Sequence, residues 1–535
     1  MTAIVQTLLL MLAVLAAVAV AARRLDVAPS ILLVIAGIGM ALVPGLPDVR
    51  LAPEVVLLVI LPPLIYSAGV AMSWREFRFN LRPIGLLAFG CVLFTAGAVA
   101  AAVHYLLNFD WASGFVLGAI IAPPDVVAPL AIARRLGLPR RLVVVLEGEG
   151  LANDATALIL YRFAVAAVAT GTFSLEKAGG TFALIVVGEI IWGIVAGWLS
   201  LRLRKWSHDP HVEITLSLMT PYFAYWVPAH FGGSGVLATV ACGLYVSWNG
   251  PRLISSATRL QGIFFWDLLV YLIEGMVFLI TGLQVRTLIE DHHAFSIGQL
   301  ATATAWTTLI AIVARFIWVF PATYLPRWLS PSLARRDPSP PWQQPFLLSF
   351  TGVRGVVSLA AALGLPYFLD SGAPFPHREL ILFVSFGVII ITLVGQGLML
   401  PRVVRWLGLT HAGAREHKEE IRAELAARVS ALEAVEKRLD NVIAERELPD
   451  EVIDLLRTRN ESRQQILPEN LQDGLEHMRL SANIKKELID AEREFIFQLL
   501  RDGKITDEAR RRIEYELDLE EASVANRAHD GGGWI

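Results

Sequence analysis

The sequence has few charged residues and almost no cysteine. Asp, Glu, Lys and Arg make up only 18% of its 535 residues, and the two cysteines, Cys91 and Cys242, both lie in apolar runs. This argues against a disulfide framework and favours free, buried thiols. No G-x-x-x-x-G-K-[ST] motif occurs, which argues against an ATP-driven pump. What is abundant is apolar sequence: the hydrophobic content is 55%, above that of ordinary soluble proteins.

Many apolar runs are long enough to cross a bilayer, which takes roughly 20 residues in a helix. We therefore predict an all-α polytopic membrane protein with about thirteen transmembrane helices. The candidate spans are 3–22, 28–45, 53–71, 83–106, 112–133, 142–170, 179–201, 213–229, 234–248, 263–284, 298–325, 344–368 and 379–401.

The loops between these runs alternate in positive charge. One set of loops holds nineteen Arg or Lys residues, and the other set holds four. Cationic loops remain in the cytoplasm, so we expect the N-terminus outside, the C-terminal tail inside, and the chain in the cell's inner (plasma) membrane. The first run has no basic residue before it and exceeds the apolar length of a cleaved signal. We interpret it as a retained span.

The composition changes after Leu409. Residues before position 411 have a net charge of +6, and the rest have a net charge of −9. We predict a transmembrane domain over 1–409 and a cytoplasmic helical tail over 410–535, where apolar residues recur at helical spacing among dense charges. The pattern fits both a solvated, weakly packed tail and a regulatory or dimer-supporting module.

Two spans are interrupted near their middles. The fifth contains Pro123 and Pro124, which cannot continue a regular helix, and Asp125 follows them. The twelfth contains Gly352, Arg354 and Gly355 in its middle, in the stretch SFTGVRG. The two spans have opposite orientations because they are seven spans apart. This is the pattern of an inverted repeat whose broken helices cross at the midplane.

The span 142–170 contains Glu149, Asn153 and Asp154 at membrane depth. Ionisable groups there are expensive and usually face a bundle interior or a water-filled path. One interpretation is an acid locked in a structural ion pair, for which Arg162 is a candidate partner of Asp154. The other is a carboxylate that exchanges a proton for a small cation, which the neighbouring breaks favour.

Other charged residues lie inside apolar spans. An unpaired arginine at the depth of Arg354 is very costly. We expect Arg354 to neutralise the carbonyl groups of the unwound stretch and the half-helix ends, or to pair with Glu149. For the remaining intramembrane charges we expect structural pairing or an interfacial position rather than substrate binding. These residues are Glu189, Asp267, Glu274 and Arg315.

Four motifs occur in register. They are ILPPLIYSAG at 60–69, APPDVVAPLAIARRLGLPRRL from 122, LEGEGLANDATALILYRFA from 146 and TGVRGVVSLAAAL at 351–363. With these motifs the chain resembles the monovalent cation:proton antiporters of the NhaP and eukaryotic sodium/proton exchanger type, over roughly residues 1–410. The resemblance implies an NhaA-like antiporter fold and a homodimer, with no cofactor, no nucleic acid and no ATP.

The resemblance also implies roles for individual residues. Asp154 matches the acid that binds the proton and the transported metal ion in turn, and Asn153 matches its companion amide. Asp125 matches the acid of the unwound helix, and Ala122 and Pro124 flank backbone carbonyls that help to coordinate the cation. Members with this Asn-Asp pair generally exchange one cation for one proton.

The resemblance likewise pairs Glu149 with Arg354 as a buried ion pair that braces the crossing. The sequence departs from the family pattern at two positions. Gly150 stands where many members have Ser, and Ser67 stands where some have Glu. The lost oxygens change the cation's coordination shell, and water or the Ser67 hydroxyl is a candidate replacement.

We therefore predict a secondary antiporter, not an enzyme, that exchanges a monovalent cation for protons in pH and sodium homeostasis. Sodium in 1:1, electroneutral exchange is the first expectation. A K⁺(Na⁺)/H⁺ antiporter is an alternative, because ion choice depends on fine differences in oxygen spacing. A non-coupled channel, or a membrane sensor with the tail as its output, is a more distant one.

Overall fold

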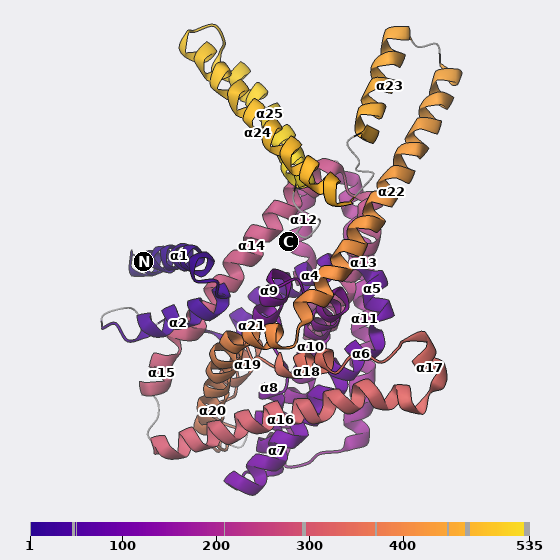
Figure 1. Ribbon diagram of the computed structural model, residues 1–535. Coiled ribbons are helices and arrows are strands. Elements are labelled where there is room, and N and C mark those ends of the chain that lie inside the picture. Colours follow the sequence, from indigo (N-terminus) through magenta and orange to yellow (C-terminus); the bar gives the residue numbers. More distant parts are fainter. Residues whose placement is uncertain are drawn as a thin grey trace. The chain divides into compact units, whose positions relative to one another are not determined.

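The structure is a computed structural model that describes residues 2–44, 49, 51–207, 209–290, 296–369, 372–446, 449–465 and 471–528. The described residues form helices and connecting segments, with no strand among them (Figure 1). The chain divides into two compact units, Met1–Gly413 and Ala414–Ile535. This confirms the predicted all-helical class.

The first unit contains helices that range from one turn to 33 residues in length. Three short stretches, labelled η, are π-helical turns. In chain order the elements are α1 (Thr2–Leu25), α2 (Pro29–Ala41), α3 (Pro53–Val55), η1 (Val56–Ile60), α4 (Leu61–Ala71), α5 (Trp74–Phe79), α6 (Leu81–Gly85), η2 (Leu86–Cys91), α7 (Val92–Leu107), α8 (Trp111–Ile121), α9 (Val127–Arg135), α10 (Arg140–Thr170), α11 (Leu175–Ser207), α12 (Pro210–His230), α13 (Val236–Leu253), α14 (Ser256–Leu283), α15 (Val285–Glu290), α16 (Ile297–Leu329), α17 (Pro331–Arg336), α18 (Gln343–Phe350), α19 (Val356–Leu363), α20 (Arg378–Ile390), η3 (Ile391–Gln396) and α21 (Gly397–Trp406).

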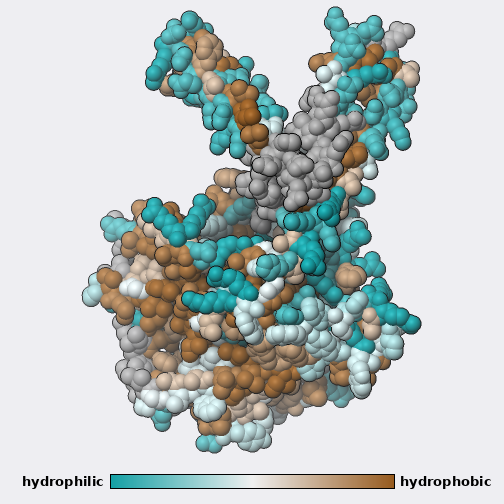
Figure 2. Space-filling model, viewed as in Figure 1, coloured by the Kyte–Doolittle hydropathy of each residue, from teal (hydrophilic) through white to brown (hydrophobic). Residues whose placement is uncertain are grey.

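Eight helices in the described part of the chain are long and apolar enough to cross a membrane. They expose apolar side chains outward: on α11, Leu184 is 75% exposed and Ile191 is 58% exposed. Figure 2 shows hydrophobic residues over much of the visible face of the first unit. An apolar surface of this extent fits a lipid environment. The eight spans are Val5–Leu25, Pro53–Ala71, Leu81–Leu107, Arg140–Thr170, Leu175–Ser207, Ser256–Leu288, Gly298–Leu329 and Arg378–Trp406.

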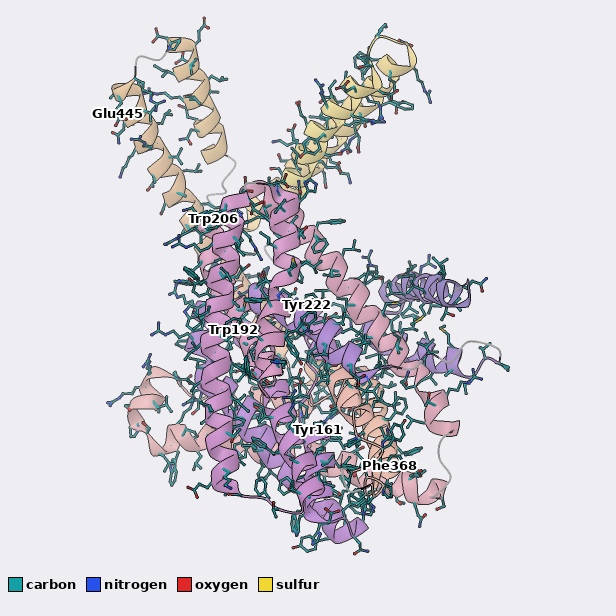
Figure 3. The ribbon with its side chains drawn as sticks, turned by 180° about the vertical axis from the view of Figure 1, so that it is seen from behind. Tyr161, Trp192, Trp206, Tyr222, Phe368 and Glu445 are labelled. Atoms are coloured by element: carbon teal, nitrogen blue, oxygen red, sulfur yellow. The ribbon has the colours of Figure 1, made fainter. Side chains whose placement is uncertain are left out.

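Small residues let several helices approach one another closely. A Cβ atom placed on Gly193 of α11 would lie 2.1 Å from the carbonyl oxygen of Ala238 on α13, and one on Gly118 of α8 would lie 2.3 Å from that of Ala96 on α7. Membrane helices gain packing energy from such backbone proximity, since lipid supplies no hydrophobic drive between them. Trp192 of α11 and Tyr222 of the adjacent α12 are labelled in Figure 3.

The two interrupted spans are broken as the sequence predicts. Helix α8 ends at Ile121 and α9 begins at Val127, so the segment between them, which contains the proline pair, is not helical. Helix α18 ends at Phe350 and α19 begins at Val356. Figure 1 places α8, α9, α18 and α19 in the middle of the first unit, around α10, and α8 and α10 are in direct contact.

The second unit consists of helices with dense surface charge. Helix α22 (Leu409–Glu445) enters it, and α23 (Asp450–Gln465), α24 (Leu471–Arg501) and α25 (Asp507–Ala528) follow. Arg493 of α24 forms ion pairs of 2.6 Å with both Asp518 and Glu521 of α25. Exposed pairs of this kind each contribute less than about 1 kcal/mol, so this hairpin also depends on its buried apolar residues.

Candidate ion-binding site

Asp154 lies near the middle of α10, a helix of 31 residues that contacts the first break through Asn153. Its side chain is half-buried. No hydrogen bond or ion pair to its carboxylate is found within the described residues. Arg162, two turns along the helix, instead donates hydrogen bonds to the carbonyl oxygens of Gly232 (3.1 Å) and Gly233 (2.6 Å). The interpretation of Asp154 as one half of an ion pair with Arg162 is therefore wrong.

Asn153 attaches α10 to the first break. Its side-chain amide nitrogen donates a hydrogen bond of 2.7 Å to the carbonyl oxygen of Pro124. Because only the NH₂ end of the amide can donate, this bond fixes the orientation of the group. The other end, Oδ1, is buried and has no hydrogen-bond partner among the described atoms. Asn153 thus positions the first break, and its Oδ1 atom remains available as an acceptor.

Asp125 joins the two breaks to each other. Its backbone N–H donates a hydrogen bond of 2.7 Å to the carbonyl oxygen of Val353 in the second break. Its carboxylate accepts a bond of 2.9 Å from the N–H of Val127, the first residue of α9. Free N–H groups at a helix start stabilise a negative charge. This hydrogen bond holds the carboxylate of Asp125 at the start of α9.

Gly355 makes room for the Asp125 carboxyl group. A Cβ atom on Gly355 would lie 1.6 Å from Oδ2 of Asp125 and 2.4 Å from its Cγ. Since no real Cβ atom makes such a contact, the missing side chain is required at this crossing. Gly355 therefore both interrupts the helix and leaves space for the Asp125 carboxyl group.

The buried ion pair differs from the prediction. Glu149 pairs with Arg315 of α16, not with Arg354: its two oxygens accept bonds of 2.5 and 2.8 Å from Nη1 and Nη2 of Arg315. Both side chains are almost fully buried. Arg315 also donates a bond of 2.9 Å from Nε to the carbonyl oxygen of Leu348. The pair connects α10, α16 and α18.

Arg354 is served by backbone carbonyls. Its Nε donates a hydrogen bond of 2.9 Å to the carbonyl oxygen of Ile121 at the end of α8, and its Nη1 donates to the carbonyl oxygen of Gly352. Its own N–H donates to the Thr392 hydroxyl, 3.0 Å away in η3. Arg354 therefore neutralises carbonyl groups exposed by both breaks, which is one of the two roles expected for it.

The remaining predicted residues are Ala122, Pro124 and Ser67. Ala122 is buried directly after α8 and packs with Ala157 of α10. Pro124 supplies the carbonyl bound by Asn153. Ser67 is half-buried on α4, and within the described residues no hydrogen bond joins its hydroxyl to Asp154 or to the breaks.

Gly150 lies one helical turn before Asp154, and Val126 fills the space beside it. A Cβ atom on Gly150 would lie 2.3 Å from Cγ2 of Val126. The space that a larger side chain at position 150 would need is thus filled by a methyl group of Val126. A methyl group cannot act as a ligand for a cation. This valine was absent from the sequence predictions, although its position next to Asp125 could have suggested it.

Of the other intramembrane charges, Glu189 and Arg315 have the structural roles predicted. Glu189 accepts hydrogen bonds of 3.0 Å from the N–H groups of Gly235 and Leu237, at the start of α13. Glu274 on α14 differs: it is half-buried and shows no ion pair or hydrogen bond in the described part of the chain. The described residues contain no group of three or more His, Cys, Asp or Glu suited to a resident metal.

Comparison with known proteins agrees with this geometry. Residues 10–406 match the family model described as sodium/hydrogen exchanger, transmembrane. An uncharacterized Na⁺/H⁺ exchanger of Mycobacterium tuberculosis is 34% identical over 516 residues, which are 95% of this chain and 93% of that one. A sodium, potassium, lithium and rubidium/H⁺ antiporter of Bacillus pumilus is 34% identical over 68% of this chain and 56% of its own length.

A solved structure has the same fold. The sodium proton antiporter MjNhaP1 of Methanocaldococcus jannaschii matches 75% of this chain and 97% of its own, with a TM-score of 0.60 and 18% sequence identity. At that identity the likeness concerns the fold. Family membership is shown by the family model, which covers most of the chain, and by the relatives at 34% identity. The chain belongs to the sodium/hydrogen exchanger family, whose members are membrane transporters and not enzymes.

Proposed function

We propose that this chain exchanges sodium ions for protons, one for one, across the cell membrane, with Asp154 as the shared binding group. The supporting observation is the setting of its carboxylate: half-buried in the middle of a long span, beside the breaks, with no bound partner among the described residues. Ionised groups at such depth need a counter-charge.

The coupling follows from competition for this carboxylate. A proton converts Asp154 to a neutral acid, and a sodium ion forms a neutral pair with the ionised form. The two need the same oxygens, so each must leave before the other binds. An ionised Asp154 that holds neither a proton nor a sodium ion is too costly to move across the membrane. The empty site therefore cannot change sides, and the two fluxes stay coupled.

The cation's other ligands would come from the breaks. Within the described residues Oδ1 of Asn153 has no hydrogen-bond partner, and the Asp125 carboxylate keeps lone pairs besides the one used by Val127. Backbone carbonyls of Ala122 and Pro124 are further candidates. Water or the Ser67 hydroxyl would complete the shell after rearrangement of α4. Oxygen ligands are those that alkali cations require.

The wider architecture that we propose has thirteen spans in an inverted repeat. The helices that contain the breaks, with α10, would move against the others and expose Asp154 to each side in turn. The N-terminus would lie outside and the tail in the cytoplasm, as the loop charges favour. Two chains would form a homodimer, and chemical cross-linking in native membranes tests that assembly.

Potassium is a second candidate cation. The Bacillus pumilus relative is named for sodium, potassium, lithium and rubidium. Val126 also presents a methyl group at the site where a hydroxyl would bring a further ligand. A shell with fewer protein oxygens dehydrates a small cation less well, which favours the larger, more weakly hydrated potassium ion.

Proteoliposomes with an imposed pH gradient test both proposals. Addition of Na⁺, Li⁺ or K⁺ in turn should dissipate the gradient for the preferred ions. Asp154→Asn should abolish the response to every ion, whereas Asp267→Asn, which changes an exposed acid of α14, should leave it intact. Exchange that persists in the Asp154 variant, or cation movement without proton counterflow, would refute the assignment.

A further inference from the structure

Three arginines converge on a pocket at one end of α16, away from Asp154. The pocket lies where α6, α10, α16 and α18 meet. It is lined by Arg82, Arg141 and Arg327, together with Pro83, Leu86, Leu87, Leu142, Val145, Val319, Ala322, Thr323, Pro340, Gln344, Pro345 and Leu348. No acidic residue is among them.

Among the described residues, one carboxylate, that of Asp337, forms ion pairs with the three guanidinium groups. Oδ2 of Asp337 accepts hydrogen bonds from Nη2 of Arg82 at 2.7 Å and from Nη2 of Arg327 at 2.8 Å, and Oδ1 lies 2.8 Å from Nη2 of Arg141. One negative charge against three positive charges leaves an excess of two. Repulsion among like charges this close is substantial where water is scarce, so the cluster as it stands favours a further anion.

The hydrogen bonds of the cluster are also incomplete. Arg327 is only 6% exposed and is fully engaged, since its Nε donates to the Asp337 carbonyl oxygen at 3.0 Å and its Nη1 donates to that of Thr323. Nη1 of Arg82, by contrast, is buried and has no acceptor within the described structure. A buried, charged N–H without an acceptor is costly.

The surroundings indicate which anion fits. The pocket's cavity volume is about 50 Å³, enough for a few water-sized groups and too small for a nucleotide. Its inner wall is apolar, and Trp328 and Leu329 beside Arg327 are 79% and 66% exposed. Exposed tryptophan next to arginine is typical of the headgroup level of a bilayer.

We propose that this pocket binds a phosphate group, that of an anionic phospholipid in the leaflet on the side of the cationic loops. Arg82 and Arg141 would hold the phosphate oxygens, to which Arg is suited by its planar fork of donors. The acyl chains would follow the exposed apolar side chains of α16. Basic pockets between membrane helices recognise lipid headgroups in this manner.

The test is a titration of the purified full-length protein in detergent with dioleoyl phosphatidylglycerol, dioleoyl phosphatidylcholine or inorganic phosphate. Thermal unfolding is followed by tryptophan fluorescence. We expect phosphatidylglycerol to raise the midpoint in a saturable way, and the other two to leave it unchanged at the same concentrations. An equal shift with phosphatidylcholine would overturn the proposal, and so would a saturable shift with inorganic phosphate alone, which would indicate a free-anion site.

Arg82→Gln tests the residues. It should raise the phosphatidylglycerol concentration needed for half of the shift by about tenfold or more, the usual effect of losing one charged hydrogen bond. Arg335→Gln changes an exposed arginine of α17 outside the pocket and should have no such effect. If Arg82→Gln does not fold, Arg141→Gln serves in its place. Equal half-saturation in the pocket and control variants would refute the site.

Discussion

At the scale of single residues, the pairing of Glu149 has the largest energetic consequence. Its carboxylate is fully buried, and both of its oxygens are bound by Arg315. Removing one partner of such a pair leaves an uncompensated charge in a medium of low dielectric, which costs about 3–5 kcal/mol. Removing both partners together can be nearly neutral, since the desolvation of both charges is avoided.

A double-mutant cycle tests this pair. Arg315→Met alone should lower the unfolding midpoint strongly, whereas Arg315→Met combined with Glu149→Gln should recover most of the loss. The measurement is thermal unfolding of the purified variants. The matched cycle pairs Glu149→Gln with Arg354→Met, and it should show little recovery because Arg354 binds backbone carbonyls. Recovery in the second cycle alone would contradict the structure.

The sequence indicated that Glu149 and both arginines were deep and needed partners, but it did not distinguish the partners. Arg315 and Arg354 lie at comparable depth in their spans, and the cost argument applies equally to each. Only the packing of α16 against α18 places Arg315 at the carboxylate, whereas the break places Arg354 among carbonyls. The choice is made by tertiary structure, which local sequence does not encode.

Gly150 yields a second prediction at this scale. Gly150→Ala would force its Cβ against Val126, 2.3 Å away, and overpacking of this kind costs about 1–3 kcal/mol. The double variant with Val126→Ala should regain stability. Gly39→Ala on α2 is the control: its Cβ meets nothing within 4 Å, so it should be neutral or stabilising. Equal midpoints for the two single variants would contradict the contact.

At the scale of elements, the two broken helices hold each other by few contacts. The N–H of Asp125 binds Val353, Asn153 binds Pro124, and Gly355 accommodates the Asp125 carboxyl group. The proline pair and the glycines predicted both breaks, because they remove donors or side chains from the helix. The role of Gly355 in the contact between the breaks was not predictable, since it depends on which atom of the other break lies opposite.

Gly355→Ala should therefore impair exchange more than folding. Its Cβ would overlap the Asp125 carboxyl group, which must rotate away or push the breaks apart. We expect the apparent cation affinity in proteoliposomes to fall by at least about tenfold, corresponding to 1.4 kcal/mol. Gly395→Ala in η3, where a Cβ would meet nothing within 4 Å, should leave affinity unchanged. Unchanged affinity in the Gly355 variant would exclude this contact as a determinant of the site.

At the scale of the whole molecule, hydropathy predicted the membrane class but did not determine the number of crossings. Eight helices meet a length and hydropathy test, whereas α2 has 13 residues and each broken span is divided into shorter helices. Proline, glycine and buried charged residues lower the hydropathy of the spans that surround the candidate ion-binding site. The division of the described structure at Gly413 reflects the change from apolar to charged composition.

The charge balance of the whole unit predicts how exchange responds to voltage. If only Asp154 changes its bound ion, the moving site has the same net charge with Na⁺ as with H⁺. A potential of 100 mV acts on each unbalanced charge with about 2.3 kcal/mol, equivalent to roughly fiftyfold in an ion gradient. In potassium-free proteoliposomes held at a fixed membrane potential, the final sodium gradient at a fixed pH difference should be the same at zero and at 100 mV. Should it shift about fiftyfold, Asp125 must also exchange a proton, and the one-for-one mechanism would be wrong.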